Sequence, residues 1–224
     1  MKIKICGLRR PEDIEYANEV KPDYIGFILT PGFRRSITKE TARGLKAKLD
    51  QGIKAVGVFV NEPTEHIVEF LEEGVIDIAQ LHGQESEEDI VYVKAVTGKP
   101  VIKVVRATGE DIGEAATPEL EKTLKRYAME AWLDSAADYL LFDSGTGTGK
   151  TFDWSVLTEM LSDYDGTLPK EFFLAGGISA ENIDEAHDAV HPYAVDLSSS
   201  VETDGVKDLE KMKLAVSAVR KYHE

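Results

Sequence analysis

Two side chains in this sequence have the type and position needed for proton transfer. Cys6, the only cysteine, ends the short run KIKICG, and Asp143 ends a second apolar run, DYLLFD. Each run has the pattern of a strand that leads into a loop, which is where α/β folds place their catalytic groups. Taken alone, Cys6 also fits a small buried apolar residue, and Asp143 fits a helix cap or loop anchor.

Two other loops have the composition of a phosphate site. Gly176 and Gly177 follow the apolar run FFLA, and Ser198, Ser199 and Ser200 follow AVDL. The loops after strands seven and eight of an α/β barrel commonly bind phosphate through backbone N–H groups. Either loop alone fits a tight turn, but together they favour a phosphorylated ligand.

Three further features are less specific. Arg34 and Arg35 follow the second apolar run, and an arginine binds a carboxylate well, although a solvated surface pair is commoner. His82, in QLHG, is typical of a structural histidine. Residues 145–151 resemble a phosphate-binding loop, but the first glycine of that motif falls on Ser144. We therefore expect a mobile loop there rather than a nucleotide triphosphatase.

A scaffold must bring these distant loops to one face, and the chain repeats a strand–loop–helix unit. The predicted strands are 2–7, 23–29, 54–60, 77–82, 101–107, 138–143, 171–175 and 193–197. The predicted helices are 11–20, one from 38, 61–74, 86–98, 118–134, 154–161, one from 179, and 209–222. This alternation predicts parallel strands with right-handed crossovers, and therefore a single (β/α)8 TIM barrel over residues 1–224. A doubly wound open sheet fits the same periodicity.

Composition narrows the classes of partner. The net charge of −15 argues against a general nucleic-acid-binding surface. One cysteine excludes an internal disulfide and a cysteine-based zinc cluster, and the five histidines show no metal-ligand spacing. No signal peptide is evident, and no apolar run approaches the roughly 18–20 residues of a membrane span. We therefore expect a cytoplasmic protein with no membrane association.

Seven short motifs follow one another between residues 4 and 202. They are KICG, GFRRSI, GVFVNE, QLHG, GTGKTFDW, AGGIS–ENI and AVDLSS–VE. Each is weak alone, but in this order they resemble the phosphoribosylanthranilate isomerase family of tryptophan biosynthesis. The resemblance implies an Amadori rearrangement of N-(5-phosphoribosyl)anthranilate that needs no metal and no cofactor. It also implies one small phosphorylated substrate and a monomer or homodimer.

The resemblance implies roles for individual residues. Cys6 corresponds to the general base and Asp143 to the general acid. Arg35 corresponds to the arginine that binds the anthranilate carboxylate, and Asp196 to an aspartate near the substrate nitrogen. The residues that correspond to the phosphate loops are Gly176, Gly177, Ser198, Ser199 and Ser200.

These roles lead to two further expectations. A thiolate base and a protonated acid require a lowered pKa at Cys6 and a raised pKa at Asp143. We expect Arg9 and Arg10 to lower the first and burial to raise the second. The family commonly has glycine where this chain has Ser200, so the loop is strained if that position needs a positive φ. Alternatively, the serine hydroxyl adds a contact to phosphate.

Three other functions remain open at this point. A related sugar isomerase of histidine biosynthesis typically uses aspartates in both catalytic roles, which Cys6 argues against. A catalytically inert barrel that senses a sugar phosphate would need neither Cys6 nor Asp143. A redox-sensing thiol protein would need a second cysteine to resolve the oxidised thiol.

Overall fold

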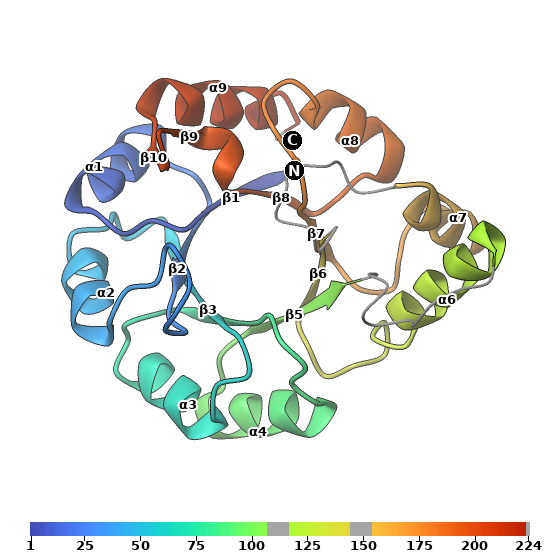
Figure 1. Cartoon of the computed structure of the whole chain (residues 1–224), viewed down its shortest axis with the longest axis horizontal. Helices are drawn as coiled ribbons and strands as arrows, with labels where there is room; N and C mark the ends of the chain where they lie inside the picture. Colours follow the sequence, from blue (N-terminus) through green and yellow to red (C-terminus); the bar gives the residue numbers. More distant parts are fainter. Residues whose placement is uncertain (107–116, 144–153, 223–224) are drawn as a thin grey trace.

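The computed structural model describes residues 1–106, 117–143 and 154–222. Within these residues, eight parallel strands close into a barrel in chain order, and helices surround it (Figure 1). The strands are β1 (Lys2–Cys6), β2 (Tyr24–Ile28), β3 (Lys54–Phe59), β4 (Ile78–Leu81), β5 (Val101–Arg106), β6 (Tyr139–Asp143), β7 (Phe172–Leu174) and β8 (Ala194–Leu197). The closed ring confirms the TIM barrel and excludes the open sheet.

The helices alternate with these strands as the sequence predicted. They are α1 (Pro11–Val20), α2 (Lys39–Lys46), α3 (Thr64–Glu72), α4 (Glu87–Thr97), α6 (Pro118–Glu130), α7 (Ser155–Asp163), α8 (Ile183–Val190) and α9 (Leu209–Arg220). Thr38 and Ser86 accept backbone N–H bonds at the starts of α2 and α4, so both act as N-caps. The prediction for 118–134 was too long, because α6 ends at Glu130. Residues 107–116, which precede α6, lie outside the described residues.

Strand alternation separates two apolar layers. In β1, Ile3 and Ile5 belong to the large cluster between barrel and helices, while Lys4 and Cys6 take the alternate, inward positions. A second cluster fills the barrel itself, and it includes Phe173. The ring of Phe173 lies edge-on to three tyrosine rings, which are those of Tyr24, Tyr139 and Tyr193. Aromatic side chains therefore close the amino-terminal end of the barrel interior.

The segment after β8 contains a hairpin that the sequence did not predict. The short helix η1 (Ser199–Val201) leads into β9 (Glu202–Thr203), which pairs antiparallel with β10 (Val206–Lys207). The buried Lys207 ammonium donates to the Ser198 carbonyl at 2.8 Å and to Glu202 Oε1 at 2.9 Å. This lysine fixes the hairpin against the end of β8.

The two ends of the described chain meet beside the barrel (Figure 1). The Met1 ammonium donates to the Tyr222 carbonyl at 2.7 Å. Among the helices that the structure describes, none has the length and apolar character to cross a membrane.

Candidate active site

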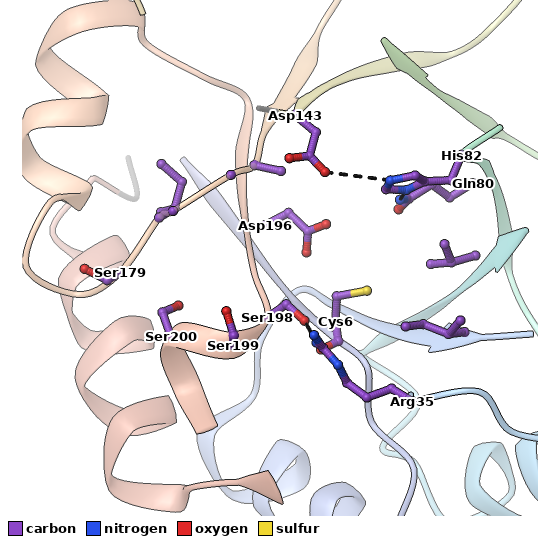
Figure 2. Close-up of a pocket in the computed structure, with 16 residues that line it drawn as sticks. Cys6, Arg35, Gln80, His82, Asp143, Ser179, Asp196, Ser198, Ser199 and Ser200 are labelled. Carbon is purple, nitrogen blue, oxygen red and sulfur yellow. Dashed lines mark hydrogen bonds and ion pairs between the residues drawn. The ribbon is translucent and has the colours of Figure 1, made fainter. Parts of the chain in front are cut away.

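A cavity of about 520 Å³ opens where the barrel strands end (Figure 2). The residues with predicted roles all line it, namely Cys6, Arg35, Asp143, Gly176, Gly177, Asp196, Ser198, Ser199 and Ser200. Gln80 and His82 also contribute to its wall. The barrel thus gathers groups from six strands or their following loops into one pocket. No cluster of His, Cys, Asp and Glu within the described residues is arranged to hold a metal ion.

Cys6 stands at the end of β1, and 8% of its surface is exposed. Its neighbour on β2 is Gly26, where an added Cβ would lie 2.7 Å from the Cys6 sulfur. Glycine at this position therefore makes room for the thiol. Burial raises the pKa of the Cys6 thiol, and the ammonium groups of Lys4 and Lys207 oppose that rise. The net direction is upward, so the expected lowering of this pKa is wrong for the free protein.

The two arginines expected to lower the pKa of Cys6 have other partners. Arg9 donates to the backbone carbonyl of Gly205 at 3.1 Å. Arg10 forms an ion pair with Asp13 at 2.7 Å. The cations that act on the Cys6 thiol are Lys4 and Lys207 instead. Lys4 lies on the same face of β1 as Cys6, whereas the two arginines follow the strand.

Lys4 and Asp196 form an ion pair inside the barrel. Their side chains are 0% and 8% exposed, and Lys4 Nζ lies 2.7 Å from Asp196 Oδ2. Burial lowers the pKa of Lys4, but the charges of Asp196 and Cys6 outweigh it and raise the net value. Burial raises the pKa of Asp196 against the opposing effect of Lys4. Asp196 Oδ1 is buried and accepts no hydrogen bond from the part of the chain described here.

Arg35 lies beside Cys6 and Ser198 (Figure 2), where it connects the loop after β2 to the loop after β8. Its guanidinium donates to the Ser198 hydroxyl and lies 3.3 Å from Glu202 Oε1. Ser198 in turn donates to the backbone carbonyl of Cys6 at 3.1 Å. Gly7 has a φ of 85°, and a Cβ there would lie 2.8 Å from Arg35 Cδ. The glycine of KICG therefore leaves the space that Arg35 occupies.

The loop after β7 presents backbone to the pocket. Gly176 and Gly177 have φ values of 82° and 72°, in the left-handed region that favours glycine. The side chain of Asn182 holds this loop in place, since its Nδ2 donates to the Gly177 carbonyl at 2.9 Å. Its Oδ1 accepts from the Ser179 N–H, also at 2.9 Å. The loop is thus held in one shape before any ligand arrives.

Ser200 does not strain the loop after β8. It lies within the 3₁₀ turn η1, and it is not among the residues with positive φ. Its hydroxyl is buried and has no hydrogen-bond partner within the described residues. The condition for strain is therefore not met, and Ser200 is one of the residues that line the pocket.

Asp143 ends β6 beside His82, which follows β4. His82 Nε2 lies 3.7 Å from Asp143 Oδ2, and both side chains are 22% exposed (Figure 2). Asp143, Asp196 and Cys6 follow one another across the pocket in this view. The predicted mobile loop at 145–151 lies outside the described residues.

Lys4 and Gln80 were not predicted from the sequence, and His82 was predicted to have only a structural role. A signal was present, because alternation places Lys4 with Cys6 on β1, and Gln80 with His82 at β4. A lysine inside an apolar strand resembles a surface residue unless the barrel interior is considered.

Several known proteins match this chain in sequence, in fold or in both. Residues 3–218 match the family model described as N-(5'phosphoribosyl)anthranilate (PRA) isomerase. An N-(5'-phosphoribosyl)anthranilate isomerase from Thermoanaerobacter sp. (strain X514) is 43% identical over 220 residues, covering 98% of each chain. The crystal structure of phosphoribosyl anthranilate isomerase from Thermus thermophilus aligns with a TM-score of 0.78 at 33% identity, covering 100% of each chain. Another such isomerase, solved in complex with reduced 1-(o-carboxyphenylamino)-1-deoxyribulose 5-phosphate, aligns at 0.78 and 31% identity over 99% of each chain.

Proposed function

Because the chain belongs to the phosphoribosylanthranilate isomerase family, we propose that Cys6 and Asp143 catalyse its Amadori rearrangement. The substrate is N-(5-phosphoribosyl)anthranilate, and the product is 1-(2-carboxyphenylamino)-1-deoxyribulose 5-phosphate. One observation carries this proposal. A thiol and a carboxyl line a single cavity, together with the glycine and serine loops that follow β7 and β8.

The lining of the cavity supports one orientation of the substrate. The 5-phosphate accepts hydrogen bonds from the backbone N–H of Gly177 and from the hydroxyl of Ser200. That hydroxyl has no other partner among the described residues. The anthranilate carboxylate binds Arg35, whose guanidinium already lies at the pocket wall. Asp196 Oδ1 accepts the substrate N–H. The ribose then lies between Asp143 and Cys6.

In the first step, the protonated Asp143 carboxyl donates to the furanose ring oxygen. The bond between that oxygen and C1′ breaks, and the nitrogen lone pair forms a C1′=N bond. The product of this step is a protonated imine that still holds its C2′ hydrogen. Asp196, near the nitrogen, stabilises the positive charge that develops there.

In the second step, the Cys6 thiolate removes the C2′ proton. The electron pair of the C2′–H bond forms a C1′=C2′ bond and neutralises the imine nitrogen. The resulting enolamine moves its 2′-hydroxyl proton to C1′ and becomes the ketone. One proton is gained at the ring oxygen and one is lost from C2′, so substrate and product are isomers. Lys4 is the nearby cation that stabilises the thiolate while it exists.

The proposal is tested with the purified wild-type protein and N-(5-phosphoribosyl)anthranilate. The decay of substrate fluorescence is followed, and the product is isolated and identified as the deoxyribulose phosphate. Steady decay with this product supports the proposal. Folded protein that leaves the substrate unchanged would contradict it and favour a barrel that only binds a sugar phosphate.

A further inference from the structure

Two inward-facing residues of the β4 end form a short hydrogen-bonded row toward Asp143. Gln80 is 1% exposed, and its Nε2 lies 2.9 Å from His82 Nδ1. His82 Nε2 points on to Asp143 Oδ2 at 3.7 Å. In Figure 2 a dashed line joins the His82 imidazole to one Asp143 carboxyl oxygen, and the second carboxyl oxygen is turned away from His82. The row runs from the wall of the barrel to the residue assigned as the acid.

The contact with Gln80 defines which ring nitrogen carries the proton. With the amide nitrogen of Gln80 assigned to the side that faces the ring, this nitrogen donates to Nδ1, which is then the unprotonated nitrogen of a neutral imidazole. The proton then lies on Nε2, which faces Asp143. Burial, followed by the charges of Arg106, Lys4 and Lys103, lowers the pKa of His82 to about 3. The ring is therefore neutral at the pH of any assay near neutrality.

Hydrogen bonds to the backbone of His82 also fix the position of its ring. Arg106, at the end of β5, donates from its guanidinium to the His82 carbonyl at 2.6 Å. The His82 N–H donates to the Phe59 carbonyl at 2.7 Å. His82 is thus held on both sides by neighbouring strands, and its ring direction follows from Gln80.

We propose that Gln80 and His82 are positioning residues that direct the acid proton of Asp143 to the carboxyl oxygen facing the substrate. The Nε2–H of His82 donates to Oδ2 of Asp143 whether the carboxyl is protonated or ionised. The proton that is transferred to the substrate is therefore bound to Oδ1. This inference rests on the proposed function, because it assumes that Asp143 is the acid. After transfer, the same N–H can donate to the carboxylate that remains on Asp143.

The reverse tautomer would have the opposite effect. A bare Nε2 would accept the Asp143 proton and hold it away from the ring oxygen of the substrate. A charged imidazolium would hold Asp143 as a carboxylate, with no proton to give. The 3.7 Å separation suits a protein without ligand, since catalytic hydrogen bonds often shorten when substrate binds.

The first test compares two amide replacements of His82. In His82→Gln, the side-chain amide reaches the place of the imidazole Nε2 and keeps a donor for Asp143. In His82→Asn, the amide is too short and replaces Nδ1 instead. We expect kcat to fall about 10- to 100-fold in His82→Asn, with KM changed less than about threefold, and His82→Gln to recover most of the rate. His66→Asn is the matched control, because the His66 side chain is 61% exposed.

A second test changes the tautomer without touching His82. In Gln80→Glu, a carboxylate faces Nδ1 and can accept a hydrogen bond only from a protonated Nδ1. The ring then has either an unprotonated Nε2 or a positive charge. Gln80→Met keeps the size and removes the donor. We expect kcat to fall further in Gln80→Glu than in Gln80→Met. Equal rates in the two variants would contradict the assignment of the tautomer.

A double-mutant cycle separates positioning from a general structural effect. In an Asp143→Ala background, His82→Asn should cause no additional loss of rate, because the residue it positions is gone. An equal loss in both backgrounds, or an unchanged kcat in the single variant, would overturn the inference. Absence of turnover in the wild-type protein would contradict the proposed function and the inference together. Normal wild-type turnover with an unaffected His82→Asn variant would contradict the inference alone.

Discussion

Replacement of Lys4 by Met tests the importance of the buried ion pair at the base of the pocket. Lys4 is 0% exposed and lies 2.7 Å from Asp196, whose side chain is 8% exposed. Methionine has a similar length and no charge, so the volume is kept while Asp196 loses its counter-charge. Removal of one partner from a buried pair typically costs about 3–5 kcal/mol of unfolding free energy. We expect a loss in that range at pH 7, measured by urea denaturation followed by circular dichroism.

The matched control is the double variant Lys4→Met, Asp196→Asn. The amide has the shape of the carboxyl and no charge, so most of the lost stability should return. If the double variant is no more stable than Lys4→Met, the loss comes from packing and the electrostatic reasoning is refuted.

The pH dependence of the same variant has a defined sign. Burial already raises the pKa of Asp196, and removal of Lys4 takes away the charge that opposes this rise. The native state then retains a proton at pH values where the unfolded chain has lost it. Stability therefore falls as pH rises from about 4, the unfolded value, to the raised pKa of the native state. The deficit of Lys4→Met should be larger at pH 8 than at pH 4.5, and a deficit independent of pH would contradict this explanation.

Three further predictions concern the pocket. Gly26→Ala places a Cβ 2.7 Å from the Cys6 sulfur, so it should displace the thiol and lower kcat with a cost of about 1–3 kcal/mol in urea unfolding. Ser200→Ala removes a buried hydroxyl that has no partner among the described residues, so KM should rise about 3- to 10-fold with little change in thermal stability. Burial raises the pKa of Cys6, so the thiolate fraction and kcat/KM should increase with pH from 6.5 to 8.5, by up to about tenfold per unit. A flat profile would contradict the last of these.

The order of strands and helices could be predicted because each depends on local pattern. Apolar runs buried on both faces indicated parallel strands, and the capping residues Thr38 and Ser86 marked two helix starts. The short β9–β10 hairpin was missed, since two-residue strands leave no periodicity to detect. The buried face of α6 is also hard to read from its apolar residues, because Leu120 and Tyr127 are exposed and Met129 is the buried residue of that helix.

The members of the site could be predicted better than their electrostatics. Residue type and position at strand ends were sufficient to select Cys6 and Asp143. The direction of the pKa shift of Cys6 was not predicted, because burial outweighs the nearby cations, and these cations are Lys4 and Lys207 rather than Arg9 and Arg10. The contact between His82 and Asp143 joins the ends of β4 and β6, which lie on either side of β5, so it depends on the order of the strands in the barrel.

The most direct test of the central claim compares Cys6→Ala and Asp143→Ala with the wild-type protein in the decay of N-(5-phosphoribosyl)anthranilate fluorescence. The proposed mechanism predicts that kcat falls by orders of magnitude in each variant, while both keep the wild-type circular dichroism spectrum and bind the reduced product analogue. Substrate deuterated at C2′ adds an independent readout, because removal of that hydrogen by Cys6 predicts a slower wild-type reaction whenever this step limits the rate. A Cys6→Ala variant that turns over substrate at the wild-type rate would contradict the assignment of the thiol as the base.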